Sequence, residues 1–566
     1  AMTGGQPVDG VLSVEKMVGQ LRGEGIKRIA IVSDNPEQFS HDFPATFIKE
    51  FKGLSIHHRD QLEVVQRELR EVCGTSVLIY VQTCAAEKRR RRKKGVMTEP
   101  KKRVFINELV CEGCGDCGVQ SNCLSVIPKD TVLGRKRRID QSACNKDYSC
   151  VKGFCPSFVT IHGGQLKKNT AMADADDWPE LPLPTFPTID EPYNIMVAGI
   201  GGTGVLTVGS VLGMAAHIAE KGTSVLTQTG LAQKFGSVTS HVRIANHQSD
   251  IHGVRIPAGD AHLLLGADLV VSTSNEALAK VNREFSSAVI NSHESPTAEF
   301  THNPDAVFPA SAMTQVIQDE TGADRTWFID ATQLGETLLG DAISANMVLL
   351  GYAWQQGMIP LPLEAIEQAI TLNNVSVEMN LKALLWGRRY SVDAHRVLAL
   401  AGMNNKSSNP NDGPQQLSDI IDYRHEFLTS YQNRAYADRY KTRVEQVRQV
   451  ESALYPDHDD SQMILTTAVA KSYFKLLSIK DEYEVARLYT NGEFEQHLKD
   501  QFEGNFSLKF HLAPPLLAKR DTVTGHLKKR EFGGWVLPLF RQLAKLKFLR
   551  GSTFDVFGYS AERKME

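Results

Sequence analysis

The sequence predicts a multidomain α/β protein with a ferredoxin-like, cysteine-rich segment between two α/β domains and a mostly helical C-terminal domain. Three observations predict this class. The chain has 566 residues, which is more than one hydrophobic core supports. Two regions alternate helical periodicity with short apolar runs that are typical of buried parallel strands. Seven of the nine cysteines fall within residues 111–155.

Residues 1–102 are expected to be part of an open α/β domain. Its first helix is predicted by apolar residues at helical spacing, and a second helix by a similar set, which are Val14, Met17, Val18 and Leu21, then Val64, Val65 and Leu69. The apolar runs at residues 29–32 and 77–81 predict two strands. Cys73 is expected to be a small core residue.

The cysteines of residues 103–165 indicate iron–sulfur chemistry. Cys111, Cys114 and Cys117 follow the C-x2-C-x2-C spacing of a cubane cluster, and Cys155 precedes a proline, as the remote fourth ligand does in bacterial ferredoxins. These four residues are the predicted ligands of a 4Fe-4S cluster. Structural zinc fits less well, because zinc sites prefer two separated pairs of ligands. A disulfide framework requires an oxidising compartment, and without a recognisable secretory signal we expect a cytoplasmic protein.

A second cluster is expected from the remaining cysteines of this segment, Cys123, Cys144 and Cys150. They lack a second C-x2-C-x2-C run, and a two-cluster ferredoxin uses eight cysteines. Either this cluster is a three-iron form, or its fourth ligand comes from elsewhere in the chain. Cys84 is the nearest candidate for that ligand.

Basic runs flank the cysteines at residues 88–94, 101–103 and 135–138. A solvated face, or a charge balance for a negatively charged cluster, is the favoured interpretation. Docking of an acidic partner is the next alternative, and we expect no nucleic-acid partner. No apolar run is long enough to cross a bilayer, so no membrane span is predicted.

Residues 166–192 are predicted to be an extended linker, because residues 174–190 are rich in proline and acidic residues and show no periodicity. Residues 193–400 then read as a second, Rossmann-like α/β domain. Strands are expected at residues 195–198, 224–227 and 268–272, and a helix carries Val208, Val211, Leu212 and Ala215 on one face.

A glycine loop joins the first of these strands to that helix. Its sequence, GIGGTG, places Gly199, Gly201, Gly202 and Gly204 as candidate cofactor-binding residues. Nicotinamide binding is weakly supported, because the second strand ends at residues 227–230 without the acid that would hold a ribose. A different phosphate-bearing ligand, or a purely structural turn, remains open.

Residues 414–566 are expected to form a mostly helical domain with a packing or capping role. We find no hydrolase triad in the sequence. Five histidines have no metal-ligand partners at convincing spacing, namely His57, His58, His217, His241 and His252.

The order of several long motifs resembles the long, fused form of indolepyruvate ferredoxin oxidoreductase, a thiamine diphosphate-dependent 2-oxoacid:ferredoxin oxidoreductase. The motifs are TGGQ, QTCAAEKRRRRKKG, CEGCGDCGVQSNC, CNKDYSC, GFCPSF, AGIGGTGVLT, LAQKFGSVTSHVRI and VEMNLKALLWGRR. The similarity extends over nearly the whole chain, which resembles the C-terminal half of that enzyme. Residues 1–102 then correspond to the C-terminal part of the thiamine diphosphate-binding domain, and residues 193–400 to the family's gamma-type domain.

The resemblance implies a reaction and its cofactors. Indolepyruvate or a related aryl 2-oxoacid, CoA and oxidised ferredoxin give acyl-CoA, carbon dioxide and reduced ferredoxin, with thiamine diphosphate and Mg²⁺ as cofactors. Thr3, Gly4, Gly5 and Gln6 match the segment beside the cofactor diphosphate. Cys111, Cys114, Cys117 and Cys155 match the cluster ligands. A homodimer of the full protein is expected.

The sequence departs from the family pattern because it lacks the Gly-Asp-Gly motif and the Asn that ligate magnesium. The resemblance therefore predicts that this chain is part of a longer polypeptide, and that the N-terminal thiamine- and pyrimidine-binding regions are missing. It should hold iron but little thiamine diphosphate, and should be inactive alone. The alternative is a non-catalytic electron-transfer subunit that works with a separate thiamine-binding chain. An NAD-dependent dehydrogenase with ferredoxin clusters is the third hypothesis.

Overall fold

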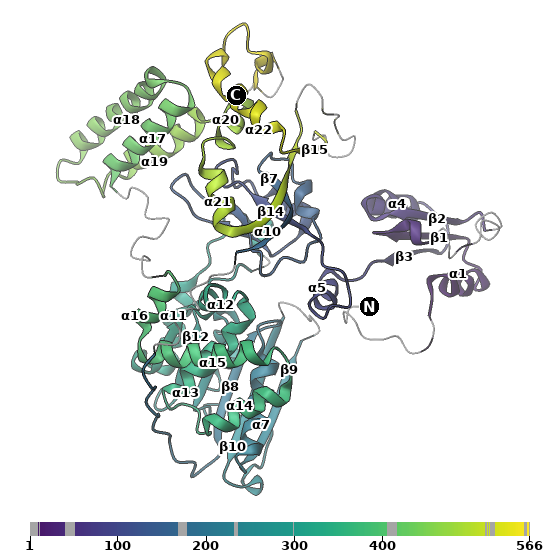
Figure 1. Cartoon of the computed structure of the whole chain (residues 1–566), viewed down its shortest axis with the longest axis vertical. Coiled ribbons are helices and arrows are strands. Elements are labelled where there is room, and N and C mark those ends of the chain that lie inside the picture. The colour runs from purple at the N-terminus through teal and green to yellow at the C-terminus, as the bar shows by residue number, and fades with distance from the viewer. Residues whose placement is uncertain are drawn as a thin grey trace. The chain divides into compact units, whose positions relative to one another are not determined.

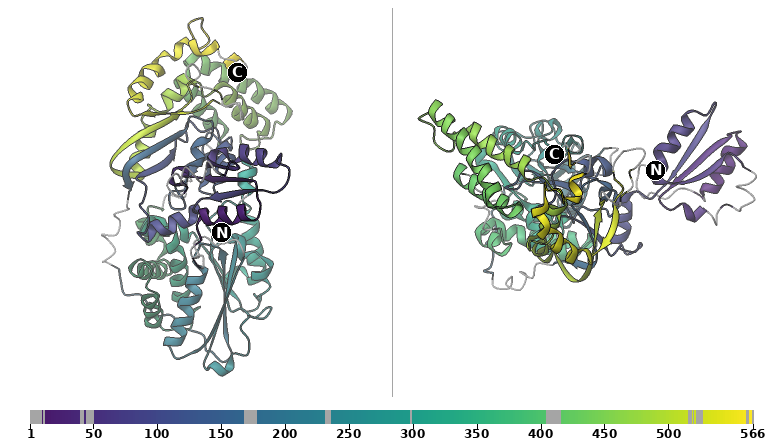
Figure 2. Two further views of the ribbon diagram at one scale, coloured as in Figure 1. Left: turned by 90° about the vertical axis from the view of Figure 1, so that its right-hand side faces the viewer. Right: turned by 90° about the horizontal axis from the view of Figure 1, so that it is seen from above.

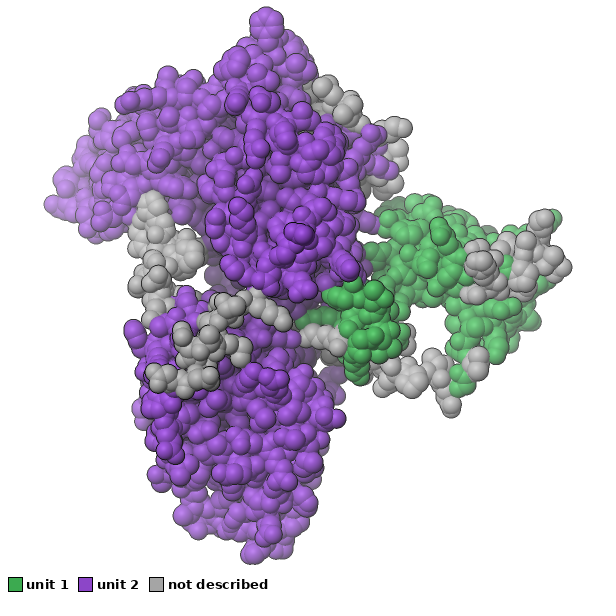
Figure 3. Space-filling model, viewed as in Figure 1, with its two compact units in different colours: residues 1–99 green, residues 100–566 purple. Residues whose placement is uncertain are grey.

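The structure is a computed structural model that divides into two compact units, residues 1–99 and 100–566 (Figure 3). It describes residues 10, 12–39, 43, 51–167, 178–230, 236–297, 299–403, 416–514, 518, 520, 527–559 and 563–564. Several sheets and many helices make it a mixed α/β protein, as predicted (Figure 1). Among the described helices, none is both long and apolar enough to span a membrane.

Unit 1 contains a parallel three-stranded sheet in the order β2-β1-β3. Its elements are α1 (Val14–Gly23), β1 (Arg28–Ser33), η1 (Pro36–Gln38), β2 (Leu54–His58), η2 (Arg59–Gln61), α4 (Leu62–Arg70), β3 (Ser76–Val81) and α5 (Ala85–Lys93). Both predicted helices and both predicted strands are confirmed. Ile29 and Ile31 on the central strand are fully buried, as the apolar run requires. The prediction for Cys73 is wrong, because this residue follows α4 in an exposed turn.

The cysteine-rich segment opens unit 2 and shares a sheet with the far end of the chain. It contains β4 (Lys102–Ile106), α6 (Asp116–Ser121), β5 (Val126–Lys129), β6 (Lys136–Ile139), η3 (Ser149–Lys152) and β7 (Phe158–Leu166). The strands β5 and β6 pair as a hairpin. The other two join β14 (Phe502–Leu512) and β15 (Arg530–Gly533) in an antiparallel sheet of order β15-β14-β7-β4 (Figure 1).

A six-stranded sheet follows, in the order β13-β12-β11-β8-β10-β9. Its strands are β8 (Tyr193–Ile200), β9 (Gly222–Thr229), β10 (Ser237–Ala245), β11 (Leu263–Gly266), β12 (Ser287–Asn291) and β13 (Thr326–Ile329). The strand β10 runs antiparallel to both of its neighbours, whereas β8, β11, β12 and β13 are parallel. Alternate residues of β8 enter two different hydrophobic clusters, so both faces of the sheet are covered (Figure 2).

Helices surround this sheet. They are α7 (Val205–Ile218), η5 (Gln248–Asp250), α8 (Leu269–Ser272), α9 (Asn275–Leu278), α10 (Glu299–His302), α11 (Ala310–Thr321), η6 (Ala323–Arg325), α12 (Ala331–Leu339), η7 (Ala342–Ser344), α13 (Ala345–Gln355), α14 (Leu363–Asn373), α15 (Val377–Val392) and α16 (Ala394–Leu400). The proline-rich residues 178–190 run without regular structure along α13, where Phe186 packs on Trp354 with ring centroids 5.6 Å apart. Gln355 also donates to the carbonyl of Pro182 at 2.5 Å.

The sequence prediction of a strand at residues 268–272 is wrong. This segment forms the short helix α8, and the strand is the apolar run just before it, β11. The carboxylate of Asp268 accepts a hydrogen bond of 2.9 Å from the backbone N–H of Val271 and thereby caps the helix. The strand expected at residues 224–227 is confirmed within β9.

After residue 416 the chain is mostly helical. Its helices are α17 (Leu417–Tyr431), α18 (Arg434–Leu454), α19 (Ile464–Leu477), α20 (Glu482–Leu488), α21 (Glu493–Gln501), α22 (Val536–Lys545), η9 (Leu546–Leu549) and η10 (Val556–Tyr559). The first three helices pack on one another around Leu428, Tyr440 and Phe474. The strands β14 and β15 were not predicted, and they attach this region to the cysteine-rich segment.

Candidate metal centre

The seven cysteines of the segment gather around one small hydrophobic cluster. Six of them belong to it, with Cys111, Cys117 and Cys150 buried, and Cys114 is exposed nearby on the same loop. All are free thiols, so the oxidised disulfide framework does not form here.

Electrostatic interactions divide these thiols into a group of four and a group of three. Burial raises the pKa of Cys117 to about 12, and the neighbouring thiolates of Cys155, Cys111 and Cys114 raise it further in that order. Burial also raises the pKa of Cys150, and the thiolates of Cys123 and Cys144 add to the rise. The group of four therefore contains the predicted cubane ligands, and the group of three contains the predicted second set.

The two groups approach each other through one pair. Among the smaller influences on the Cys150 thiol is Cys117, which belongs to the other group. The backbone of Gly153 also lies close to Cys117. A Cβ atom at Gly153 would be only 3.1 Å from the Cα atom of Cys117. The segment thus holds two neighbouring groups of thiols.

The chemistry of the thiols fits an iron–sulfur group. Burial raises the pKa of the Cys111 thiol to about 11, so these side chains stay protonated at neutral pH unless a cation binds them. A metal cluster deprotonates its ligands and returns that free energy as folding free energy. Backbone N–H groups already point at sulfur, because Gly113 donates to Cys111 at 3.3 Å and Lys146 to Cys144 at 3.4 Å. Such donors stabilise thiolates.

The thiols do not form a site for a single ion. Within the described ranges, no group of three or more His, Cys, Asp or Glu side chains is close enough to ligate one metal ion. A zinc ion would hold its sulfurs about 3.8 Å from one another, because Zn–S bonds are about 2.3 Å long. A cubane instead gives each iron its own thiolate, so its ligands stand farther apart.

Buried cations lie beside the group of four. The side chain of Lys136 lies 4.0 Å from the Glu112 carboxylate, and Arg137 stacks on Phe300 at 4.2 Å and donates to the carbonyl of Pro304 at 2.9 Å. Lys136 and Arg137 are both buried, so the solvated-face interpretation is wrong for this part of the basic run. Burial lowers the pKa of Arg137, and the thiolates of Cys117 and Cys111 act in the opposite direction.

Three residues of the C-terminal region border the cysteines and were missed by sequence reasoning. They are Lys480, Tyr489 and Lys529. The Nζ atom of Lys480 lies 3.9 Å from Glu112, the residue after Cys111. No motif marks these residues, because they reach the site through nonlocal contacts, Lys480 and Tyr489 at the two ends of α20 and Lys529 just before β15.

The glycine loop lies at the carboxyl end of β8, as predicted, but its backbone donors are partly occupied. The Ile200 N–H donates to the Asp268 carboxylate at 2.6 Å, and the Gly201 N–H to the carbonyl of Gly236 at 2.7 Å. Burial raises the pKa of Asp268, and its hydrogen bonds to backbone N–H groups oppose that rise. An internal carboxylate in this position competes with a bound phosphate, so these contacts favour the structural turn among the alternatives.

The same edge of the sheet carries a polar cluster next to the second thiol group. His293 Nδ1 lies 3.1 Å from the Asp330 carboxylate, which raises the pKa of the imidazole against the effect of burial. Glu336 accepts a hydrogen bond of 2.8 Å from Ser142, two residues before Cys144. The helix α12, which follows β13 of the six-stranded sheet, is therefore hydrogen-bonded directly to the cysteine segment.

The structure does not test two other parts of the predicted site. Thr3, Gly4, Gly5 and Gln6 lie outside the described residues. Cys84 belongs to unit 1, where it is exposed immediately before α5. Its role as a fourth ligand stays a prediction.

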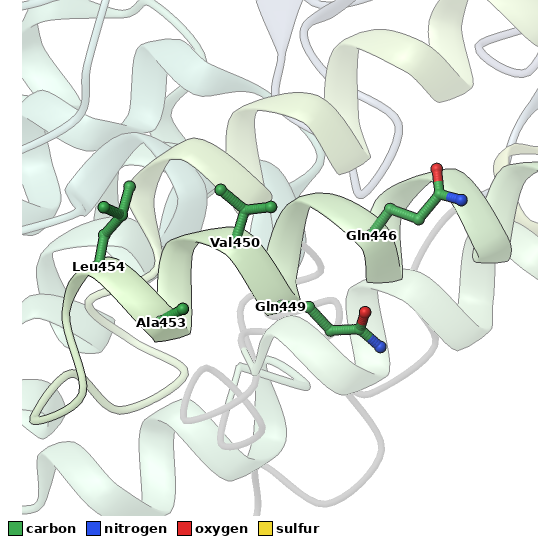
Figure 4. A pocket seen from close by; sticks show the side chains of 5 residues that line it. All are labelled: Gln446, Gln449, Val450, Ala453 and Leu454. Carbon is green, nitrogen blue, oxygen red and sulfur yellow. The ribbon is translucent and has the colours of Figure 1, made fainter.

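A surface hollow on α18 offers no chemistry for catalysis. Its lining comes from this one helix and is apolar or neutral, namely Gln446, Gln449, Val450, Ala453 and Leu454 (Figure 4). Neither a titratable group nor a nucleophile lines it.

Comparison with known proteins places two parts of the chain. Residues 194–390 match the family described as pyruvate ferredoxin/flavodoxin oxidoreductase, and residues 417–566 match a family of unknown function. The chain is similar to indolepyruvate oxidoreductase subunit IorB of Pyrococcus horikoshii, with 30% identity over 34% of this chain and 92% of that protein. The same subunit of Thermococcus kodakarensis is 29% identical over 34% of this chain and 94% of its own length.

Solved structures of related subunits were also found. Pyruvate oxidoreductase subunit PORC of Thermotoga maritima has 19% identity and a TM-score of 0.26, and the match covers 35% of this chain and 97% of that one. A 2-oxoglutarate:ferredoxin oxidoreductase from Magnetococcus marinus has 15% identity and a TM-score of 0.27, over 36% of this chain and 31% of that one. On the sequence matches over residues 194–390, the chain belongs to the 2-oxoacid:ferredoxin oxidoreductase family, as an indolepyruvate ferredoxin oxidoreductase-like member.

Proposed function

We propose that this chain takes part in the oxidative decarboxylation of indolepyruvate, or a related aryl 2-oxoacid, to acyl-CoA, and that it passes the electrons through iron–sulfur clusters to ferredoxin. The observation that carries the proposal is the division of seven free thiols into adjacent groups of four and three. These groups lie in the same compact unit as the segment that matches the oxidoreductase family. The names of the archaeal relatives support indolepyruvate as the substrate.

Cys111, Cys114, Cys117 and Cys155 would hold a 4Fe-4S cluster, and Cys123, Cys144 and Cys150 a second cluster. Bound there, the clusters would supply one-electron carriers. The protein ligates them with thiolates, places backbone N–H donors on the sulfurs, and surrounds them with apolar side chains that exclude water. The buried cations Lys136 and Arg137 offset the negative charge of the thiolates.

The proposed enzyme uses thiamine diphosphate and Mg²⁺, and this sequence lacks most of the residues that would bind them. Thr3 to Gln6 would lie beside the diphosphate, and CoA would enter as a co-substrate. The glycine loop at Gly199, Gly201, Gly202 and Gly204 remains a candidate for its phosphates. A cytoplasmic location suits a protein with nine cysteines and exposed thiols at Cys73 and Cys84. We propose a homodimer for the assembled enzyme.

A second candidate function is a non-catalytic electron-transfer subunit that serves a separate thiamine-binding chain. The relatives favour it, because they are named as subunits and are matched over more than 90% of their own length. Mixing the purified chain with a thiamine-binding partner tests both hypotheses. A chain that restores turnover only in the presence of that partner is the subunit, whereas turnover by the chain alone would contradict the subunit hypothesis and the expected inactivity of the isolated chain.

Anaerobic purification with iron and sulfide counting and low-temperature EPR tests the clusters. About eight irons and two interacting reduced signals would indicate two cubanes, and about seven a cubane with a three-iron cluster. About four irons would leave Cys123, Cys144 and Cys150 without the proposed task. Colourless protein, or protein that holds only zinc, would overturn the proposal.

A further inference from the structure

The region of unknown function, residues 417–566, completes the fold of the cysteine-rich segment. The strand β14 pairs with β7 along most of its length, with Phe510 opposite Val159. One hydrophobic cluster contains Phe105, Val159 and Ile161 from the cysteine segment together with Phe494 and Phe510 from the C-terminal region. The strands β4 and β7 of the cysteine segment therefore share a second core with the C-terminal region, and β14 lies beside β7 in the sheet (Figure 1).

The contact reaches the fourth ligand of the first thiol group. Tyr489 is fully buried, and its hydroxyl donates a hydrogen bond of 2.7 Å to the carbonyl oxygen of Pro156, directly after Cys155. Asn107, four residues before Cys111, donates to the carbonyl oxygen of Leu488 at 3.2 Å. Both ends of the ligand loop are thus fixed to the residues at the end of α20.

A cation from the same region lies among the thiols. The Nζ atom of Lys529, just before β15, donates to the carbonyl oxygen of Val151 at 3.3 Å and lies 5.0 Å from the centre of the Phe158 ring. The groups that act on its charge include the thiolates of Cys155 and Cys117 from the group of four and of Cys150 from the group of three. The ammonium group therefore stands within electrostatic reach of both thiol groups.

A positive charge in this position has a defined effect on electron transfer. Reduction adds one negative charge to a cluster that is already negative, and a nearby cation in a water-poor site stabilises the reduced form more than the oxidised form. Burial lowers the pKa of Lys529, but the thiolates and Asp116 act in the opposite direction. The negative charge of these thiolates and of Asp116 thus favours the protonated lysine.

We propose that residues 417–566 cover the iron–sulfur segment and place a positive charge beside its clusters. That charge is the ammonium group of Lys529, which raises the reduction potential of the adjacent clusters. This inference depends on the proposed clusters, and it gives a task to the region of unknown function. Lys529 is not a ligand, so its removal should change the potential and not the iron content.

The test is a potentiometric titration of the full chain, purified without oxygen and followed by EPR. Lys529→Met should shift the one-electron reduction equilibrium of a cluster about tenfold toward the oxidised form, which corresponds to about 59 mV. Lys529→Arg should retain the potential. Lys528→Met is the matched control, because Lys528 is the preceding lysine and is exposed. Its potential should equal that of the unmodified chain.

The possible outcomes separate this inference from the proposed function. Full iron content with an unchanged potential in Lys529→Met would overturn the role of Lys529 alone. An unmodified chain without iron would overturn the proposed function and this inference with it. If the Met variant loses its clusters, Lys529→Gln keeps a polar side chain in the same place and is titrated instead. A potential equal to that of the unmodified chain in this variant would contradict the proposal.

Discussion

The hydroxyl of Tyr489 donates a hydrogen bond of 2.7 Å to the carbonyl oxygen of Pro156, the residue that follows Cys155. The tyrosine ring also packs edge-on against Phe494 and Phe510, with centroids 4.9 Å and 5.1 Å away. A single side chain of the C-terminal region therefore connects its aromatic core to the fourth predicted ligand of the first cluster. Sequence separation hides this connection, because the two residues are 333 positions apart.

Replacement of this hydroxyl should weaken the site without changing its shape. Tyr489→Phe leaves the ring in place but removes the donor to the buried carbonyl, which should cost about 1–3 kcal/mol. We expect a lower thermal midpoint and faster bleaching of the visible cluster absorbance in air. Tyr455→Phe is the control, because the Tyr455 side chain is exposed. Equal bleaching rates in both variants and the unmodified chain would contradict the structural role of Tyr489.

The division of the thiols predicts different effects of individual cysteine variants. Cys155→Ser should remove the four-iron EPR signal, because Cys155 interacts with each other member of the group of four. Cys144→Ser should instead affect the second cluster, because Cys144 interacts with Cys123. Cys73→Ser, at an exposed position in unit 1, should leave the iron content unchanged.

Iron counting and EPR of the three variants check this prediction. If Cys144→Ser removes the four-iron signal and Cys155→Ser does not, the assignment of the two groups is reversed. If each variant removes both signals, the segment binds its clusters only as one cooperative unit.

The glycine loop offers a test of packing against backbone strain. Gly202 and Gly204 have positive φ values, 105° and 90°, which residues other than glycine rarely adopt. A Cβ at Gly202 would meet no atom within 4 Å, whereas one at Gly204 would overlap the amide of Asn346. We expect Gly202→Ala to cost about 1–2 kcal/mol from backbone strain alone. Gly204→Ala should cost about 1–3 kcal/mol more, from overpacking.

The difference in thermal midpoint between Gly202→Ala and Gly204→Ala measures the cost of overpacking at Gly204. If the two variants are equally stable, Asn346 moves aside, and the loop has more space than the structure shows. A phosphate-bearing ligand that stabilises the unmodified chain and not Gly202→Ala would favour the binding function of the loop over the structural turn.

Local sequence patterns predicted the elements whose structure is decided locally. The helix at Val14, the strand at residues 29–32 and the strand–loop–helix around the glycine loop all follow from periodicity and glycine content. The prediction of a strand at residues 268–272 failed, because the four apolar or small residues 269–272 fit a short helix as well as a strand, and the cap by Asp268 decides between them.

The candidate site was predicted through its cysteines and no further. Their spacing identified the thiols, and the structure brings them together in two groups. Lys480, Tyr489 and Lys529 could not be predicted, because each reaches the cysteines through the nonlocal pairing of β14 with β7 or through packing of α20. Single lysines and tyrosines in a helical region carry no signal of such pairing.

Lys480 predicts a distinct dependence of stability on pH. Its side chain is 11% exposed and its ammonium group lies 5.2 Å from the centre of the Phe427 ring. Burial lowers its pKa from 10.5 to about 8, although Glu484 and Glu112 oppose the shift. Between these two values the unfolded chain binds more protons than the folded chain. The contribution of Lys480 to stability is therefore complete above pH 10.5 and is lost as the pH falls toward 8.

Lys480→Met should remove this dependence. In the unmodified chain, Lys480 should increase the free energy of unfolding by up to about 1.4 kcal/mol per pH unit in this window. The difference in thermal midpoint between the unmodified chain and Lys480→Met, measured from pH 7 to 10, should thus shift in favour of the unmodified chain above pH 8. Lys475→Met, at an exposed position on α19, is the control and should follow the unmodified chain at each pH. A constant difference between the unmodified chain and Lys480→Met would mean that Lys480 titrates alike in the folded and unfolded states.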